Sequence, residues 1–231
     1  MAIRPVFVPM TDGDIGVIEK AIDFKWHPGM AKSQKQKSVS ELHSAAKLFG
    51  INNILEISSK SLDELGILLS AFNLSFVTKR YNQQITVESA FQGSKVFKRG
   101  GPYKDLYLAD SMTSKKDIRI KDSGQLVGFN FFNIEFPLIP RTYFYDWLYI
   151  NALVNNPQLV EELYKFDGFS DIEFNPKKSI NCQAHAAALF VSLSSAGALE
   201  EALSSPDLFL RITKQHYDNQ TRVIQVQDSL I

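Results

Sequence analysis

The sequence has a single cysteine, Cys182, so it cannot form an internal disulfide. It has no apolar run approaching the roughly 18 residues that a membrane-spanning helix needs. The first ten residues lack the basic segment and apolar core of a secretory signal. These absences predict a cytoplasmic protein that does not contact a membrane, in which Cys182 is a small buried residue.

Other absences limit the ligands and the number of domains. The four histidines are scattered and show no zinc-ligand spacing, so we expect neither a metal nor another cofactor. No Gly/Ser/Pro-rich linker divides the 231 residues. With 45% apolar residues and 17 phenylalanines, the chain can bury one large core. We therefore expect a single domain over residues 1–212, followed by a C-terminal tail, 213–231.

The 25 basic residues balance the 25 acidic ones, which argues against a general polyanion binder. Their distribution is uneven, however. Residues 25–37 hold four lysines and no acid, and residues 95–121 hold eight basic and three acidic residues. Such stretches are typical of surfaces that contact phosphate groups, and equally of solvated lysine-rich loops.

Periodicity and capping residues predict a mainly α fold with a few short strands. Ser-x-x-Glu capping boxes place helix starts at Ser38 and Ser61. The expected helices are 38–50, 61–72, 86–99, 142–154, 157–165, 180–196 and one from residue 205. The expected strands are 3–9, 76–81 and a hairpin over 125–138.

The central stretch 86–99 is an amphipathic helix by its pattern. Glu88, Gln92 and Lys95 recur at i, i+4 and i+7, so they share one edge beside the apolar arc. By pattern alone this edge is also typical of an ordinary surface helix. A carboxylate, an amide and an ammonium on one edge are nevertheless candidate site groups.

Residues 87–97 (VESAFQGSKVF) resemble the glutamate-containing helix of the NADAR (YbiA-like) family, written Thr/Ser-x-Glu-His-x-x-Gln-x-x-Lys-Phe. Ser89 stands at the family's usual histidine, and Gly93-Ser94 replaces its usual alanine-containing pair. Further segments resemble the subgroup encoded beside DarT-type DNA ADP-ribosyltransferase toxins, namely 23–29 (DFKWHPG), 55–61 (LEISSKS), 101–107 (GPYKDLY), 144–151 (FYDWLYIN) and 171–183 (DIEFNPKKSINCQ).

The resemblance implies a single-domain hydrolase that removes ADP-ribose from guanine bases in DNA and so acts as an antitoxin. Glu88 then stabilises the ribosyl cation or orients water, and Lys95 acts as acid, binding group or covalent nucleophile. Glu173 is a third predicted catalytic residue. The family's Asp-x-x-Trp-Gly run is absent here, so no residue is carried over from it.

The predicted substrate-binding residues come mostly from the same segments. They are Lys25, Trp26, Gly29, Ser58, Ser59, Lys60, Gln92, Tyr149, Asp171, Asn175 and Asn181. Several also have scaffold interpretations. Trp26 is a candidate core anchor, residues 58–60 can precede a helix cap, and Asp171 and Glu173 can cap a helix after Pro176.

The expected partners are ADP-ribosylated DNA, single-stranded by preference, and a cognate DarT-type toxin. Two alternatives remain. One is an N-glycosidase of a phosphorylated small metabolite, although the basic, Trp26-containing segment 23–37 favours nucleic acid. The other is a non-catalytic antitoxin that masks its toxin by direct contact.

Overall fold

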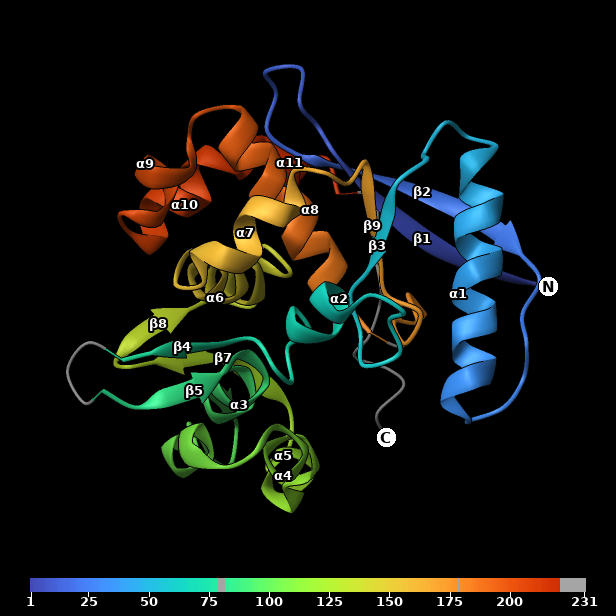
Figure 1. The fold of residues 1–231 in the computed structure, drawn as a ribbon. Helices are drawn as coiled ribbons and strands as arrows, with labels where there is room; N and C mark the ends of the chain where they lie inside the picture. Colours follow the sequence, from blue (N-terminus) through green and yellow to red (C-terminus); the bar gives the residue numbers. More distant parts are fainter. Residues whose placement is uncertain (79–81, 178, 221–231) are drawn as a thin grey trace.

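A computed structural model describes residues 1–78, 82–177 and 179–220. Its largest sheet has four strands, and the two long ones form the hairpin at the start of the chain (Figure 1). Two short strands extend the sheet beyond β1, first an antiparallel one and then a parallel one. In spatial order the strands are β2 (Val17–Phe24), β1 (Ala2–Pro9), β9 (Gly168–Ser170) and β3 (Ile54–Glu56).

Two helices cover opposite faces of this sheet. Neighbouring residues of a strand point to opposite faces, so Val6 packs with α1 (Lys32–Lys47) and Phe7 with the main core. That core is built around α8 (Gln183–Ser195), in which residues 184–193 are all buried. α8 packs against the sheet and against α6 (Tyr143–Val154), which is equally apolar.

Short elements in the middle of the chain form a second region around α3 (Val87–Gly93), the helix that contains Glu88 (Figure 1). Its three-stranded sheet packs aromatic side chains against α6, for example Phe136 against Phe144 with ring centroids 4.7 Å apart. The elements are β4 (Ser75–Val77), β5 (Gln84–Thr86), α3 (Val87–Gly93), β6 (Lys95–Phe97), the 3-10 helix η1 (Lys104–Leu108), α4 (Ser111–Lys116), α5 (Ile118–Asp122), β7 (Leu126–Phe131) and β8 (Ile134–Phe136).

The remaining helices complete the core around α6 and α8. They are α2 (Glu64–Leu68), α7 (Pro157–Leu163), α9 (Leu199–Leu203), α10 (Pro206–Ile212) and α11 (Lys214–Asp218). α11 lies within the predicted tail but is packed, because the buried Tyr217 donates a hydrogen bond to Asp146 at 3.1 Å. Residues 221–231 of that tail lie outside the described residues. None of the described helices has the length and apolar character to cross a membrane.

The prediction of a mainly α fold was wrong. Helices make up 43% and strands 19% of the described residues, in three separate sheets, so the class is mixed α+β. Most of the missed strands are three residues long, too short for alternation to be seen. β9, for instance, is buried at all three positions.

Several individual elements were predicted correctly. The strand 3–9, the 125–138 hairpin and the helices after 142, 157 and 205 are confirmed. The hairpin turns at Phe132 and Asn133, whose φ angles of 47° and 71° suit a type I′ turn. Of the predicted strand 76–81, residues 79–81 lie outside the described part.

Helix boundaries account for the remaining errors. α1 begins at Lys32, so Ser38 lies inside it, buried, and accepts a hydrogen bond from the His27 N–H. Asp63 caps α2, and the predicted cap, Ser61, accepts a hydrogen bond from the Asp63 N–H instead. α8 starts at residue 183, after the buried Cys182.

Candidate active site

Glu88 lies in the first turn of α3 and is 7% exposed. Thr86 caps this helix, since its hydroxyl accepts a hydrogen bond from the Ser89 N–H at 3.2 Å. The Glu88 N–H donates outside the helix, to the Ala71 carbonyl at 2.9 Å. The glutamate is therefore held where two chain segments meet.

Two hydrogen bonds join Glu88 to Lys95. The Gln92 amide nitrogen donates to Glu88 Oε1 at 2.9 Å, and the Lys95 ammonium donates to Gln92 Oε1 at 2.7 Å. The predicted helix 86–99 was too long, because α3 ends at Gly93 and Lys95 pairs with Phe129 as the first residue of β6. The three side chains meet, but from a helix and a strand.

The surroundings of Lys95 lower its pKa to about 8, chiefly because burial removes the ammonium from water. Repulsion by Lys115 lowers the pKa further, whereas the charge of Glu88 raises it. The Lys95 Nζ also lies 4.8 Å from the centre of the Phe91 ring. A lysine with such a pKa can hold or release a proton near neutral pH.

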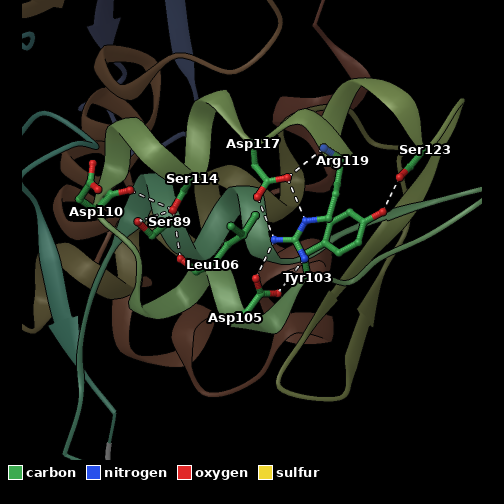
Figure 2. Close-up of polar contacts among 9 residues, drawn as sticks. All are labelled: Ser89, Tyr103, Asp105, Leu106, Asp110, Ser114, Asp117, Arg119 and Ser123. Atoms are coloured by element: carbon green, nitrogen blue, oxygen red, sulfur yellow. Dashed lines mark hydrogen bonds and ion pairs between the residues drawn. The ribbon is translucent and has the colours of Figure 1, made fainter.

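Small side chains fasten α3 to the neighbouring region of η1 and α4. The Ser89 hydroxyl donates to the Ala109 carbonyl at 2.8 Å. Ser114 Oγ donates to Ser89 Oγ at 3.1 Å (Figure 2). At Gly93 the approach is closer still, because a methyl group there would stand 2.6 Å from the Tyr107 ring. α3 therefore lies directly on η1.

Arg119 holds the outer part of this region together. It donates to Asp105 at 2.6 Å and to Asp117 at 2.8 Å, and its guanidinium lies 4.5 Å from the centre of the Tyr103 ring (Figure 2). The Tyr103 hydroxyl in turn hydrogen-bonds Ser123. Arg119 is thus paired with two carboxylates.

Gln183, the first residue of α8, connects three segments of the site. Its amide nitrogen donates to the Ile57 carbonyl at 2.5 Å, and its amide oxygen accepts from the Ala71 N–H at 2.7 Å. Because the Ala71 carbonyl accepts from Glu88, residues 57, 71, 88 and 183 are joined by consecutive hydrogen bonds.

A second buried carboxylate, Glu56 in β3, was not among the predicted site residues. It is 2% exposed and accepts hydrogen bonds from the Ser58 hydroxyl (2.7 Å), the Ser170 hydroxyl (2.6 Å) and the Ile172 N–H (2.8 Å). His43 of α1 also lies 2.8 Å from Ser170 Oγ. Burial raises the pKa of Glu56, and the three hydrogen bonds that it accepts oppose this shift by favouring the ionised form.

Asp171 follows Ser170 and lies in the electrostatic environment of Glu56. Its Oδ1 accepts hydrogen bonds from the N–H groups of Glu173 (3.0 Å) and Phe174 (3.2 Å). Burial raises the pKa of Asp171 well above that of a free aspartate, and the charge of Glu56 raises it further. Burial and the charge of Glu56 therefore both favour the protonated form of Asp171.

Tyr145 of α6 faces both parts of the site. Its ring packs at 90° to Phe91, with centroids 5.2 Å apart. Burial raises the pKa of the Tyr145 phenol well above 10, and the charge of Glu88 raises it further. Tyr145 lies in segment 144–151 but was not predicted. The predicted Tyr149 is fully buried and donates to the Leu69 carbonyl at 2.7 Å.

Trp26 lies beside two cations at the edge of the large sheet. The Arg4 guanidinium is 5.3 Å and the Lys35 ammonium 4.7 Å from its ring centroid. Lys35 also pairs with Glu173 at 3.2 Å. Glu173 and Trp26, both predicted site residues, are thus connected because each contacts Lys35. This connection does not involve Glu88. Two more predicted residues of this stretch are exposed, Lys25 and Gly29.

The other predicted binding residues differ in exposure. Ser58 is buried against Glu56, Ser59 is exposed, and Lys60 is half-buried, with its N–H donating to Ser58 Oγ at 3.1 Å. Asn175 and Asn181 are half-buried in the segment between Asp171 and α8. No spacing pattern could have identified Glu56 or Tyr145, because the groups that surround them come from segments distant in the sequence.

A cavity of about 280 Å³ lies at a different place, between the β1–β2 turn, α8 and α11. Asp14, His185 and His216 help to line it, and no predicted site residue does. His185 lies 3.3 Å from the buried Asp146 carboxylate. Within the described ranges, no three His, Cys, Asp or Glu side chains gather as metal ligands would.

Comparison with protein families supports the resemblance seen in the sequence. The DarT1-associated NADAR antitoxins match residues 2–223, nearly the whole chain, and this match runs past residue 212. No curated protein matches the sequence. The matched residues include α3, β6 and the loop that carries Asp171. The protein therefore belongs to the family of DarT1-associated NADAR antitoxins.

Proposed function

We propose that the protein is an N-glycosidase that removes ADP-ribose from guanine bases in DNA, reversing the modification made by a DarT-type toxin. Its family supports the antitoxin role. The observation that supports catalysis is the hydrogen-bonded series of Glu88, Gln92 and Lys95, which holds a buried carboxylate near an ammonium.

Hydrolysis breaks the bond between the anomeric carbon of the ribose and a guanine nitrogen. Water adds its hydroxyl to the carbon, and the nitrogen receives a proton. Positive charge develops on the ribosyl group in the transition state, so a nearby carboxylate stabilises it or orients the water. Glu88 has this role in our proposal, and its burial strengthens the interaction because less water screens the charge.

Lys95 assists at the same centre. With a pKa of about 8 it is charged at neutral pH, and Gln92 holds it. It is then a donor that can protonate the leaving nitrogen or contact a ribose hydroxyl or a phosphate. Gln92 contributes by setting the positions of the carboxylate and the ammonium relative to each other.

The region around Trp26 is proposed to bind the DNA strand or the diphosphate. Trp26 is partly exposed and can stack on a base, and the nearby Lys25, Lys32 and Lys37 are exposed. Glu173 contributes by holding Lys35 beside Trp26. Gly29, Ser58, Ser59, Lys60, Asp171, Asn175 and Asn181 are proposed to contact the ADP-ribose, and the cytoplasm is the proposed location.

A non-catalytic antitoxin that masks its toxin is the second candidate, because the family is named for association with the toxin and not for a reaction. In that case the toxin would form a stable complex with the protein. Glu88→Gln would then leave protection intact, since masking needs no carboxylate.

The test is to incubate the protein with a single-stranded oligonucleotide that carries ADP-ribose on guanine and to follow the DNA mass. We expect the wild type to restore the unmodified mass and Glu88→Gln to fail. Glu161→Gln, at an exposed position in α7, is the matched control and should act as wild type. If the wild type leaves the mass unchanged, a toxin pull-down separates masking from hydrolysis of a small metabolite.

A further inference from the structure

We infer that Tyr145 contacts the substrate, and that its hydroxyl donates a hydrogen bond to an oxygen of the ribosyl group bound beside Glu88. This inference rests on the proposed function and adds a residue that the family resemblance did not supply.

The hydroxyl of Tyr145 differs from those of the other buried tyrosines. Tyr107, Tyr143, Tyr149 and Tyr217 each hydrogen-bond a protein group, such as the Leu69 carbonyl for Tyr149. Tyr145 is 6% exposed, and its hydroxyl has no hydrogen-bond partner in residues 1–78, 82–177 and 179–220. A buried tyrosine hydroxyl normally has one, so this group is open to a ligand.

The Tyr145 oxygen is also accessible. The polar side-chain atoms that are both fully buried and unpaired in the described part are Arg4 Nε, Thr142 Oγ1 and Trp147 Nε1. Tyr145 is not one of them, so its oxygen forms part of the small surface that the residue exposes.

The groups around this hydroxyl indicate which ligand oxygen it meets. Glu88 and Asp171 act on it electrostatically, as do Tyr149 and Cys182, and burial keeps the phenol protonated. It is therefore a donor beside the Glu88 carboxylate. A phosphate would be repelled by that carboxylate, whereas a sugar hydroxyl can accept from the phenol and donate to Glu88.

Packing would fix the phenol in place for this contact. The Tyr145 ring lies against Phe91, with centroids 5.2 Å apart, and is stacked on Tyr149 at 6.2 Å. Phe91 in turn contacts the Lys95 ammonium. Tyr145 and Lys95 therefore both contact Phe91, which lies one turn of α3 beyond Glu88.

The test compares Tyr145→Phe with Tyr143→Phe, since each change removes one hydroxyl and keeps the ring. For Tyr145→Phe we expect kcat/KM on ADP-ribosylated single-stranded DNA, and calorimetric affinity for free ADP-ribose, to fall about 10- to 100-fold with Tm nearly unchanged. Tyr143→Phe loses its hydrogen bond to the Pro206 carbonyl, so Tm should fall and kcat/KM should stay close to wild type.

The outcomes separate this inference from the proposed function. If the wild type cleaves the DNA and Tyr145→Phe matches it in kcat/KM and in affinity, the inference is wrong and the function stands. If the wild type binds ADP-ribose but does not cleave, the hydrolase proposal fails, and the affinity of Tyr145→Phe alone decides the inference. A wild type that neither cleaves nor binds overturns both.

Discussion

The Lys95 ammonium lies 2.7 Å from the amide oxygen of Gln92, and this contact determines the orientation of the amide. An ammonium can only donate, so the oxygen of Gln92 must face Lys95 and its nitrogen must face Glu88. The glutamine thus presents an acceptor to the cation and a donor to the carboxylate, which a methionine or leucine of similar size cannot do.

Replacing Gln92 by methionine should therefore separate Lys95 from Glu88 while preserving volume. We expect kcat/KM on ADP-ribosylated DNA to fall about 10- to 100-fold, because the two groups lose their common partner. The free energy of unfolding, measured in urea, should change less than the activity. Unchanged kinetics would show that the hydrogen-bonded series has no part in the reaction.

The pH dependence of the reaction should reveal the state in which Lys95 acts. If the ammonium is the working form, kcat/KM falls as pH rises through about 8, where Lys95 loses its proton. Lys95→Arg keeps a charge at every accessible pH, so whatever activity it retains should lack this fall. Activity that instead rises through pH 8 would mean that the neutral amine reacts, as a nucleophile would.

Glu56 should matter for stability. Glu56→Ala leaves the hydroxyls of Ser58 and Ser170 and the N–H of Ile172 without their buried acceptor. We expect a loss of about 2–4 kcal/mol in the free energy of unfolding. Glu64→Ala, at an exposed position in α2, is the control and should cost far less. Equal losses would contradict the assigned network.

The raised pKa of Asp171 makes its contribution to stability dependent on pH. Its protonated form stabilises the fold at acid pH, and that stabilisation is lost as pH rises above 3.8 and through the higher folded value. Asp171→Asn cannot ionise. The Tm of this variant relative to wild type should therefore increase with pH, and a difference that is constant across the titration would argue against a protonated Asp171.

The lysines near Trp26 should differ in their effect on DNA binding. In a Glu88→Gln background, changing Lys25, Lys32 and Lys37 together to alanine should weaken binding and reduce the salt slope by about 2. Lys35→Ala should change that slope little, because Lys35 already pairs with Glu173. Titrations at several salt concentrations measure both, and equal slopes for all variants would place the DNA elsewhere.

The sequence predicted the part of the site that depends on local spacing. Glu88, Gln92 and Lys95 lie next to one another even though α3 ends at Gly93. Lys95 follows the helix directly and still donates a hydrogen bond to the Gln92 side chain. Glu56 could not be found in this way, since its three donors come from residues 58, 170 and 172. Only the structure shows which of the hydroxyls of Tyr145 and Tyr149 hydrogen-bonds another protein group, and the sequence could not distinguish them in this respect.

The same limit explains the error in fold class. A strand such as β9 exists because β1 and β3 lie on either side of it, and its three residues alone have no strand signature. Longer elements with strong turn or cap residues, such as the hairpin at Phe132 and Asn133, were predictable because the signal lies within them.

Gly93 constrains changes in two segments, α3 and η1, because they contact each other at this residue. Its Cα lies so close to the Tyr107 ring that neither residue can be enlarged or moved alone. A relative with alanine at this position must hold the segment 103–107 further from α3, because the added methyl group would also lie 3.0 Å from the Tyr103 carbonyl oxygen. Changes at 93 and in the segment 103–107 should therefore occur together, and Gly93→Ala alone should destabilise the protein.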